Sequence, residues 1–362
     1  MAVAGSHHLR QRDFVHLADI KPRSNAYIAW EHRRHRQAHW LVECAAEFMG
    51  VFFYVFAGVG STASFILSGT AQLNGLGSLF QIGTAYAFGI LFAIVVCAPT
   101  SGGHFNPAMT IAHLIFKRVT PAKALRYIVA QVLGAYVACL LVYVQWRDLI
   151  MEVIEILEAA GKLDAVMFTA NGPAGIFAIY ATPGVSLGRI FLNEFVCDFL
   201  IGLVIWACLD PTNFSAPPAA GPWIISFAYA VVVWGYSPVT APSQPVATNA
   251  ARDVGARLMA LTIWGMPAGG GSYAAIAALT NIPATLLAVA FYEFVLADSS
   301  RVTAFEKYMS LTSLVLPVVT PIHADFLAGH LAHEEHSQGV IREASASPNL
   351  DEKSHEQIIE RV

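Results

Sequence analysis

Charged residues are scarce in this sequence. Asp, Glu, Lys and Arg make up 13% of the 362 residues, roughly half of their share in an average soluble domain. None of them occurs in four long stretches, at residues 48–116, 127–146, 211–251 and 258–292. Because a helix needs about 20 mostly apolar residues to cross a bilayer, these stretches hold five spans, and a sixth fits between them. The sequence therefore predicts a multi-pass membrane protein embedded in a lipid bilayer.

A basic excess is missing as well. The formal net charge is -4, so nothing indicates nucleic acid or another polyanion as a partner. No catalytic triad, metal-ligand cluster or phosphate-binding loop is visible, and we expect neither an enzyme nor a bound cofactor or metal. The cysteines lie in apolar stretches, which favours buried free thiols over a disulfide scaffold: Cys44, Cys97, Cys139, Cys197 and Cys208.

Both ends of the chain are polar. Residues 1–40 contain seven Lys and Arg residues and no apolar run like a signal-peptide core, so we expect a cytosolic N-terminal arm. Residues 298–362 hold ten acidic and five basic residues and should form a disordered C-terminal tail. Four tail histidines could bind a metal, but their spacing beside glutamates is more typical of a solvated segment: His323, His330, His333 and His336.

Six spans can be placed on the apolar runs of the membrane region, residues 41–297. They lie near residues 41–67, 79–98, 122–145, 188–209, 222–240 and 273–296. The connection at 117–126 carries four Lys and Arg residues, whereas the long connection at 147–187 is acidic. By the positive-inside rule both termini face the cytosol. Apolar residues recur at helical spacing within 147–157, which predicts an amphipathic extension of the third span, with a partner site as the alternative.

An internal repeat relates the two halves of this region. The segments AAEFMGVFFYVF and FLNEFVCDFLIGLVIW align Glu47 with Glu194, and SGGHFNPAMTIA and PVATNAARDVGA align Asn106 with Asn249. The repeats, about 41–146 and 188–297, are joined by the outer loop 147–187. Since each contains three spans, they must have opposite orientations, as in the inverted repeats of transport proteins.

Two short segments look like half-helices that enter the membrane from opposite sides. Asn106 and Asn249 are favoured helix N-caps, and Pro107 suits the first helical position. Such backbone is tolerated at membrane depth only beside protein or a wet cavity. Two helix N-termini meeting there, each with an Asn amide as a donor, would form a polar spot that repels cations.

The chain thereby resembles the major intrinsic protein family, the aquaporins and aquaglyceroporins, over roughly residues 41–297. The matching segments are AAEF, SGGHFNPA, ALRYIVAQVLGA, FLNEF and NAARDVGAR. The resemblance implies an all-α fold of six spans and two re-entrant half-helices in an inverted 3+3 repeat. It also implies a pore in each protomer, a homotetramer, and water or small polyols as permeants.

Two features depart from the family pattern. The first half-helix motif is Asn106, Pro107 and Ala108, but the second is Asn249, Ala250 and Ala251, without proline. Ala is a good helix former, so the helix can survive this change. The segment 237–249 is also about four residues longer than is usual, and could fold inward over the pore.

The resemblance also identifies selectivity-filter positions. Arg252 matches the filter arginine, with an ion pair to Asp253 as the structural alternative. The other positions are Tyr86 or Phe88 on the second span, Val233 or Ser237 on the fifth, and the backbone at Val246. Neither Val233 nor Ser237 is the histidine that water-selective members share at the fifth-span position. Together with Asp253, Arg257 and Pro283, this pattern is similar to the aquaglyceroporin branch.

Three polar side chains within the membrane region have two interpretations each. Glu47 and Glu194 could relay protons, but the resemblance implies that each accepts hydrogen bonds from the loop before its half-helix. His104 could face the cytosolic pore mouth or anchor its loop.

We therefore expect a passive channel for water and neutral solutes such as glycerol that excludes ions through the half-helix dipoles, Asn106, Asn249 and Arg252. The alternatives are a water-selective aquaporin, a poorly conducting scaffold or osmoregulatory member, and, less favoured, a proton-coupled transporter. The last would have to use Glu47, Glu194, Asp198 or Glu293.

Overall fold

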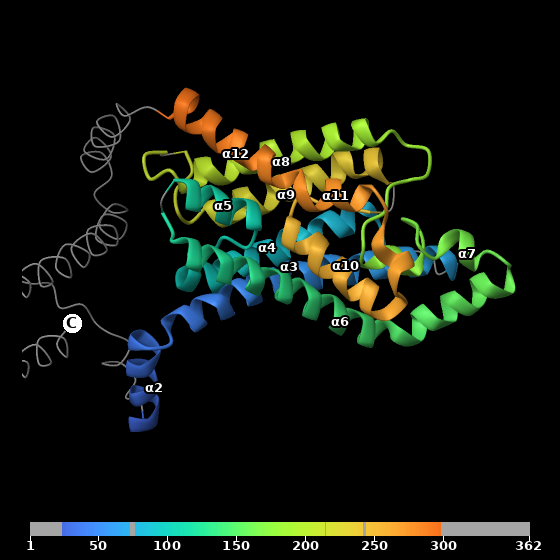
Figure 1. Ribbon diagram of the computed structural model, residues 1–362, viewed down its shortest axis with the longest axis horizontal. Helices are drawn as coiled ribbons and strands as arrows, with labels where there is room; N and C mark the ends of the chain where they lie inside the picture. The colour runs from blue at the N-terminus through green and yellow to red at the C-terminus, as the bar shows by residue number, and fades with distance from the viewer. Residues whose placement is uncertain (1–23, 73–76, 117, 214, 242–243, 298–362) are drawn as a thin grey trace, which may run out of the picture. The chain divides into compact units, whose positions relative to one another are not determined.

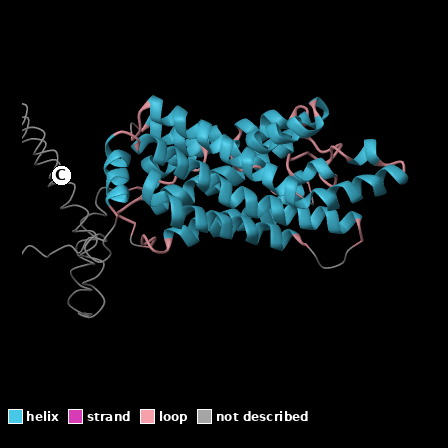
Figure 2. Ribbon diagram, turned by 90° about the horizontal axis from the view of Figure 1, so that it is seen from below, coloured by secondary structure: helices cyan, strands magenta, loops and turns pink. Residues whose placement is uncertain are grey.

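The computed structural model describes residues 24–72, 77–116, 118–213, 215–241 and 244–297. All regular structure in these ranges is helical (Figure 2). The predicted C-terminal tail with its four histidines and the first 23 residues of the predicted N-terminal arm lie outside the described residues. A short helix, α2 (Asn25–Arg36), capped by Ser24, precedes the first span.

Six helical segments are long and apolar enough to cross a membrane. Five are single helices: α3 (His39–Thr70), α4 (Leu79–Ser101), α6 (Pro121–Ala159), α8 (Leu187–Leu209) and α9 (Gly221–Thr240). The sixth consists of α11 (Tyr273–Leu279), α12 (Asn281–Phe291) and a final π-helical turn at Tyr292–Leu296. Every span predicted from the sequence corresponds to one of these segments, and the protein is an integral, multi-pass membrane protein.

The sixth span is broken near its middle because of Pro283. A proline inside a helix lacks the N–H for the backbone hydrogen bond and clashes with the carbonyl four residues earlier, here that of Leu279, where α11 ends. Directly after the break, the Asn281 side-chain amide donates to the Thr248 carbonyl at 2.9 Å. The last span is thereby attached to the loop that precedes the second half-helix.

Helix α6 extends well beyond the predicted third span. Its 39 residues are roughly 58 Å long, about twice the hydrocarbon thickness of a bilayer. In the extension, Ile150, Val153 and Leu157 are buried while Glu152 and Glu155 are exposed. This is the predicted amphipathic extension of the third span. The chain then passes through α7 (Leu163–Val166) and a 3-10 turn at Pro173–Ile176 into α8.

The half-helices α5 (Pro107–Ile115) and α10 (Ala250–Trp264) enter the bundle from opposite ends (Figure 1). A 3-10 turn at Met266–Gly269 follows α10. Helix α3 packs against α4 and α6, and α8 packs against α9 and α12, while α4 and α9 join the two repeats. Each half-helix also contacts a long helix of the other repeat, α5 against α12 and α10 against α6. This is the inverted 3+3 arrangement expected from the sequence.

All five cysteines are free thiols, as expected. Three of them are buried, and Cys44 and Cys208 are partly exposed. Among the described residues, no three His, Cys, Asp or Glu side chains come together so that they could hold a metal ion.

Candidate functional site

The two half-helices begin in nearly the same way. Asn106 has φ -153° and ψ 129°, and Asn249 has φ -154° and ψ 115°. The Oδ1 atom of each accepts a hydrogen bond from the N–H two residues later, at 2.9 Å in both cases. The residues before them, Phe105 and Thr248, both have φ 47°. The second helix thus keeps the geometry of the first although Ala250 replaces proline.

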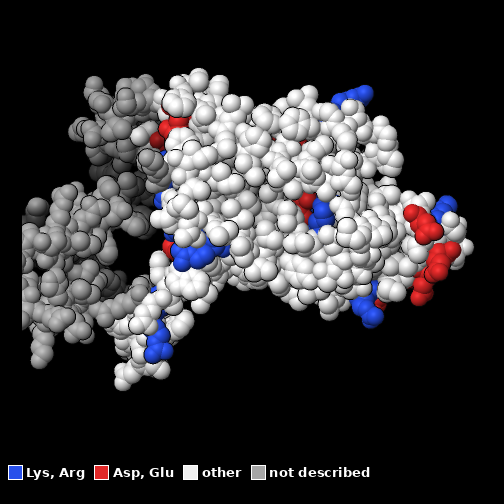
Figure 3. Space-filling view, viewed as in Figure 1, with Lys and Arg blue, Asp and Glu red and all other residues white. Residues whose placement is uncertain are grey.

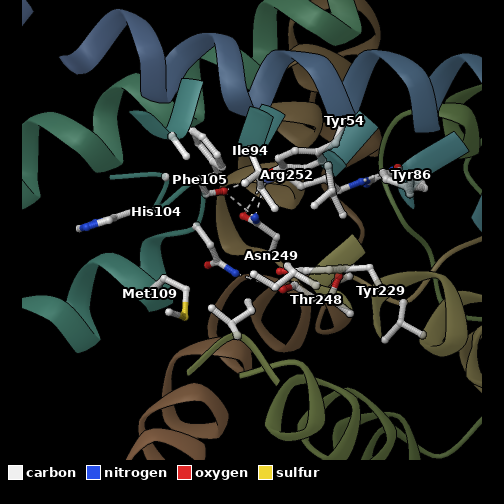
Figure 4. Close-up of a pocket in the computed structure, with 18 of the residues that line it drawn as sticks. Tyr54, Tyr86, Ile94, His104, Phe105, Met109, Tyr229, Thr248, Asn249 and Arg252 are labelled. Atoms are coloured by element: carbon white, nitrogen blue, oxygen red, sulfur yellow. Dashed lines mark hydrogen bonds between the residues drawn. The ribbon is translucent and has the colours of Figure 1, made fainter. Parts of the chain in front are cut away.

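The two asparagine motifs meet in the middle of the bundle. Asn249 Nδ2 donates to the Phe105 carbonyl at 2.8 Å, and Asn106 Nδ2 donates to the Thr248 carbonyl at 3.3 Å. Each asparagine therefore binds the carbonyl just before the other one, and Figure 4 shows Asn249 directed at Phe105. The positive ends of both half-helices face this point, so it repels cations.

Glu47 holds the loop before the first half-helix. Its carboxylate accepts hydrogen bonds from the N–H groups of His104 (3.0 Å) and Phe105 (2.7 Å), and from the side chains of Ser101 and Gln131, both at 2.7 Å. Four donors offset the desolvation of this buried charge. The side chain does not line the cavity that runs past the meeting point of the two asparagine motifs.

Glu194 holds the loop before the second half-helix in the same manner. Its carboxylate accepts from the Ala247 N–H at 3.0 Å, from the Thr248 N–H at 3.5 Å and from the Tyr273 hydroxyl at 2.8 Å. It too lies outside the cavity lining. Both glutamates are therefore placed to fix loops rather than to pass protons along the cavity.

A cavity of about 130 Å³ runs past the meeting point of the motifs, enough for several water molecules. Residues from both repeats line it. The sequence-predicted residues at the wall are Tyr86, His104, Asn106, Val233, Val246, Asn249 and Arg252. Figure 4 shows His104 toward one end, Tyr86 toward the other and Asn249 between them.

Arg252 is held by neutral oxygen atoms. Its Nε and Nη2 atoms donate to the Tyr86 hydroxyl at 3.1 and 3.0 Å, and its Nη1 donates to the Phe177 carbonyl at 3.0 Å. The Asp253 carboxylate is bound instead by Arg257, at 2.6 Å. Arg252 is therefore free to present its charge to the cavity, and an Arg252–Asp253 ion pair is not what the structure has.

The structure also distinguishes between the paired alternatives for the filter. Tyr86 lines the cavity, whereas Phe88 is 40% exposed on the outside of the bundle beside Trp223. Val233 lines the cavity, whereas Ser237 is buried away from it. Val233 is the fifth-span position if the extra residues of segment 237–249 follow Thr240, where α9 ends.

The longer segment before Asn249 packs against the outer loop. Gln244 is completely buried, accepts from the Tyr180 N–H at 2.7 Å and donates to the carbonyls of Gly175 and Ala178. Its contacts lie with this loop, and only the residues directly after it reach the cavity wall. In the described part of this segment, then, the chain does not fold inward.

Three functional positions have no clear signal in the sequence. Phe177 comes from a connection that looks like a surface loop, although the apolar run IFAIY within it hints at burial. Tyr54 lies in an apolar span. His113 also lines the cavity, and its ring stacks on that of His104 with centroids 4.3 Å apart.

The family model of the major intrinsic proteins matches residues 34–267. The chain belongs to the major intrinsic protein family. It is therefore a member of a channel family and not an enzyme. It is 58% identical over 292 residues to aquaporin-3 of Laccaria bicolor, covering 80% of this chain and 87% of that protein.

Other relatives extend the comparison. The glycerol uptake facilitator protein of Pseudomonas aeruginosa is 33% identical over 224 residues, which cover 62% of this chain and 76% of that protein. The solved aquaglyceroporin of Plasmodium falciparum superposes with a TM-score of 0.60 at 22% identity, covering 71% and 97% of the two chains. The latter likeness supports the fold assigned to the family.

Proposed function

We propose that this chain is a passive pore for water and small polyols such as glycerol. The observation that carries the proposal is the composition of the cavity wall. Among the described residues that line it, Arg252 alone has a permanent charge; it donates to the hydroxyl of Tyr86, and the apolar side chain of Val233 lines the same cavity. A cavity that combines a polar group with apolar side chains suits a polyol, whose hydroxyls and carbon backbone need different partners.

Ion exclusion follows from the same geometry. A cation in the cavity meets the positive ends of α5 and α10 and the guanidinium of Arg252, with no carboxylate among the described lining residues to offset them. The four carboxylates that a proton-coupled transporter would need, Glu47, Glu194, Asp198 and Glu293, are not part of that lining. A coupled mechanism is therefore not favoured.

Polyol conduction is favoured over strict water selectivity by Val233. A histidine there would narrow the filter and add a donor suited to water, whereas valine leaves room beside Tyr86. Relatives named glycerol uptake facilitator and aquaglyceroporin agree with this. The more similar relatives are named aquaporins, so a water-selective pore is the second candidate.

We also infer a homotetramer with both termini in the cytosol. Family membership supports the oligomer. Basic side chains lie around α2 and the start of α6, and acidic side chains gather on the extension of α6 at the opposite end of the bundle (Figure 3). By the positive-inside rule the basic end faces the cytosol.

Stopped-flow light scattering on vesicles with the purified protein separates the candidates. Water and glycerol flux both above the level of empty vesicles supports the proposal. Water flux alone indicates a water-selective pore, and neither flux indicates a scaffold. A glycerol flux that depends on a proton gradient would contradict a passive pore.

A further inference from the structure

Tyr54 lies on α3 at the level where the two asparagine motifs meet. It is 5% exposed and lines the cavity. Its hydroxyl accepts a hydrogen bond from Asn249 Nδ2 at 2.8 Å and donates to the Phe105 carbonyl at 3.1 Å. Since Asn249 Nδ2 also donates to that carbonyl, the three groups form a closed triangle of hydrogen bonds (Figure 4).

The triangle engages the nitrogen of the Asn249 side chain. Nδ2 donates to both the Tyr54 hydroxyl and the Phe105 carbonyl. The Oδ1 atom accepts from the N–H groups of Ala251 and Arg252 at 2.9 and 3.3 Å. Asn249 is thus bound by the protein through both the oxygen and the nitrogen of its side-chain amide.

The position after Asn249 explains why such a bond would be needed. In the first half-helix, Pro107 fixes φ at the first helical residue. Ala250 does not restrict φ in this way, yet the backbone of Asn249 matches that of Asn106 within 14° in ψ. Glu194 fixes the loop before Asn249, and Tyr54 binds the Asn249 side chain itself.

Tyr54 is itself held firmly enough to constrain Asn249. A Cβ atom placed on Gly89 would come within 2.5 Å of the Tyr54 Cα, so α4 packs directly against the α3 backbone at this point. A Cβ atom on Gly50 would meet the ring of Phe105, which means that this ring lies against α3 one turn before Tyr54. Both partners of Asn249 are thereby fixed to the same helix.

We propose that Tyr54 is a positioning residue that holds Asn249 and the start of α10 in place of the absent proline, and through them Arg252. Arg252 follows Asn249 by three residues, and its N–H is bound by the Asn249 side chain. A displaced Asn249 therefore moves the backbone that carries the filter guanidinium. The flux part of this inference rests on the proposed function, whereas the bond network does not.

Tyr229 provides a matched control. It is the tyrosine of α9 that lines the same cavity, and Asn106 lines that cavity as well. Asn106 already has Pro107 after it. Removing the hydroxyl of Tyr229 should therefore produce an effect that a proline at position 250 does not reverse.

The test is a double-mutant cycle on the purified full-length protein. Tyr54→Phe, Ala250→Pro and their combination are compared with the unchanged protein and with Tyr229→Phe in both backgrounds. Two quantities are measured: the permeability of erythritol relative to glycerol in vesicles, and the thermal unfolding midpoint in detergent. Ala250→Gly, which loosens φ further, provides a third background and takes the place of the proline background if Ala250→Pro does not fold.

We expect Tyr54→Phe to raise the erythritol-to-glycerol ratio by about threefold and to lower the midpoint by roughly 2–4 °C, as for one lost buried hydrogen bond. In the Ala250→Pro background both effects should disappear, and in the Ala250→Gly background both should grow. The effects of Tyr229→Phe should be the same in all backgrounds.

The inference would be overturned if Tyr54→Phe changed neither the permeability ratio nor the unfolding midpoint. Effects of equal size in all backgrounds would also overturn it, because independent sites give additive changes and Tyr54 would then act on the permeant or the fold directly. If the unchanged protein conducts no solute, the proposed function fails, but the unfolding cycle still decides whether Tyr54 and Ala250 are coupled through Asn249.

Discussion

The Tyr86 hydroxyl accepts hydrogen bonds from two nitrogens of Arg252, Nε at 3.1 Å and Nη2 at 3.0 Å. Arg252 is only 2% exposed, so this hydroxyl and the Phe177 carbonyl replace water around the guanidinium. Because both acceptors are neutral, the positive charge is not cancelled. The pair combines a fixed charge with an aromatic wall at one end of the cavity.

Replacing Arg252 with alanine should widen this end of the cavity and remove the fixed charge. We expect larger polyols to pass and the cation leak to rise by at least about tenfold, because the charge is a main electrostatic barrier. Vesicle swelling measures the solute range, and currents across planar bilayers measure the leak. A folded variant with an unchanged solute range and leak would remove Arg252 from the filter.

Gly58 sets the position of the Tyr86 ring. A Cβ atom on Gly58 would approach this ring to 2.2 Å, whereas a Cβ atom on Gly60, on the same helix, meets nothing within 4 Å. Gly58→Ala should push Tyr86 into the cavity and reduce glycerol permeability by roughly tenfold, since overpacking typically costs 1–3 kcal/mol. Gly60→Ala is the control. Equal glycerol fluxes for the two variants would show that Tyr86 does not limit the pore.

Val233→His tests whether this position of the cavity wall selects between water and glycerol. The larger ring should narrow the cavity beside Arg252, so glycerol permeability should fall by about tenfold while water permeability changes by less than about threefold. Stopped-flow measurements of both fluxes on the same vesicles give the ratio. A loss of both fluxes in equal proportion would mean that Val233 does not select between the solutes.

The Asp253–Arg257 ion pair should contribute to stability rather than to conduction. Asp253 is completely buried, and Arg257 also donates to the carbonyls of Ile179 and Gly269. Asp253→Asn leaves a buried cation without its counter-charge and should destabilise the fold by about 3 kcal/mol. Thermal unfolding in detergent measures this. A thermal unfolding midpoint within roughly 1 °C of that of the unchanged protein would contradict a stabilising role for the ion pair.

Much of the fold follows from local sequence features. The absence of charge marks the six spans, and the repeated Glu and Asn motifs mark the inverted halves, because both properties are carried by consecutive residues. The broken sixth span also has a local cause in Pro283, although the run of apolar residues predicts one continuous span. The resemblance to the family singles out Tyr86 and Arg252, and both residues line the cavity.

The contacts that complete the site could not be predicted in this way. Phe177 reaches Arg252 from a loop 75 residues earlier in the chain, and Tyr54 reaches Asn249 across 195 residues. Nothing in the sequence around a tyrosine in an apolar span predicts a hydrogen-bond partner so far along the chain. Likewise, Gly58 is one small residue among several on α3 until the packing of Tyr86 against it is known.

Glycerol flux tests the account most directly. Vesicles containing the unchanged protein are exposed to an inward glycerol gradient and to an impermeant osmolyte, and light scattering follows both responses. The account predicts fast water flux together with glycerol uptake well above that of empty vesicles, with no dependence on a proton gradient. Fast water flux with glycerol uptake at the level of empty vesicles would contradict it and would place the protein among water-selective pores.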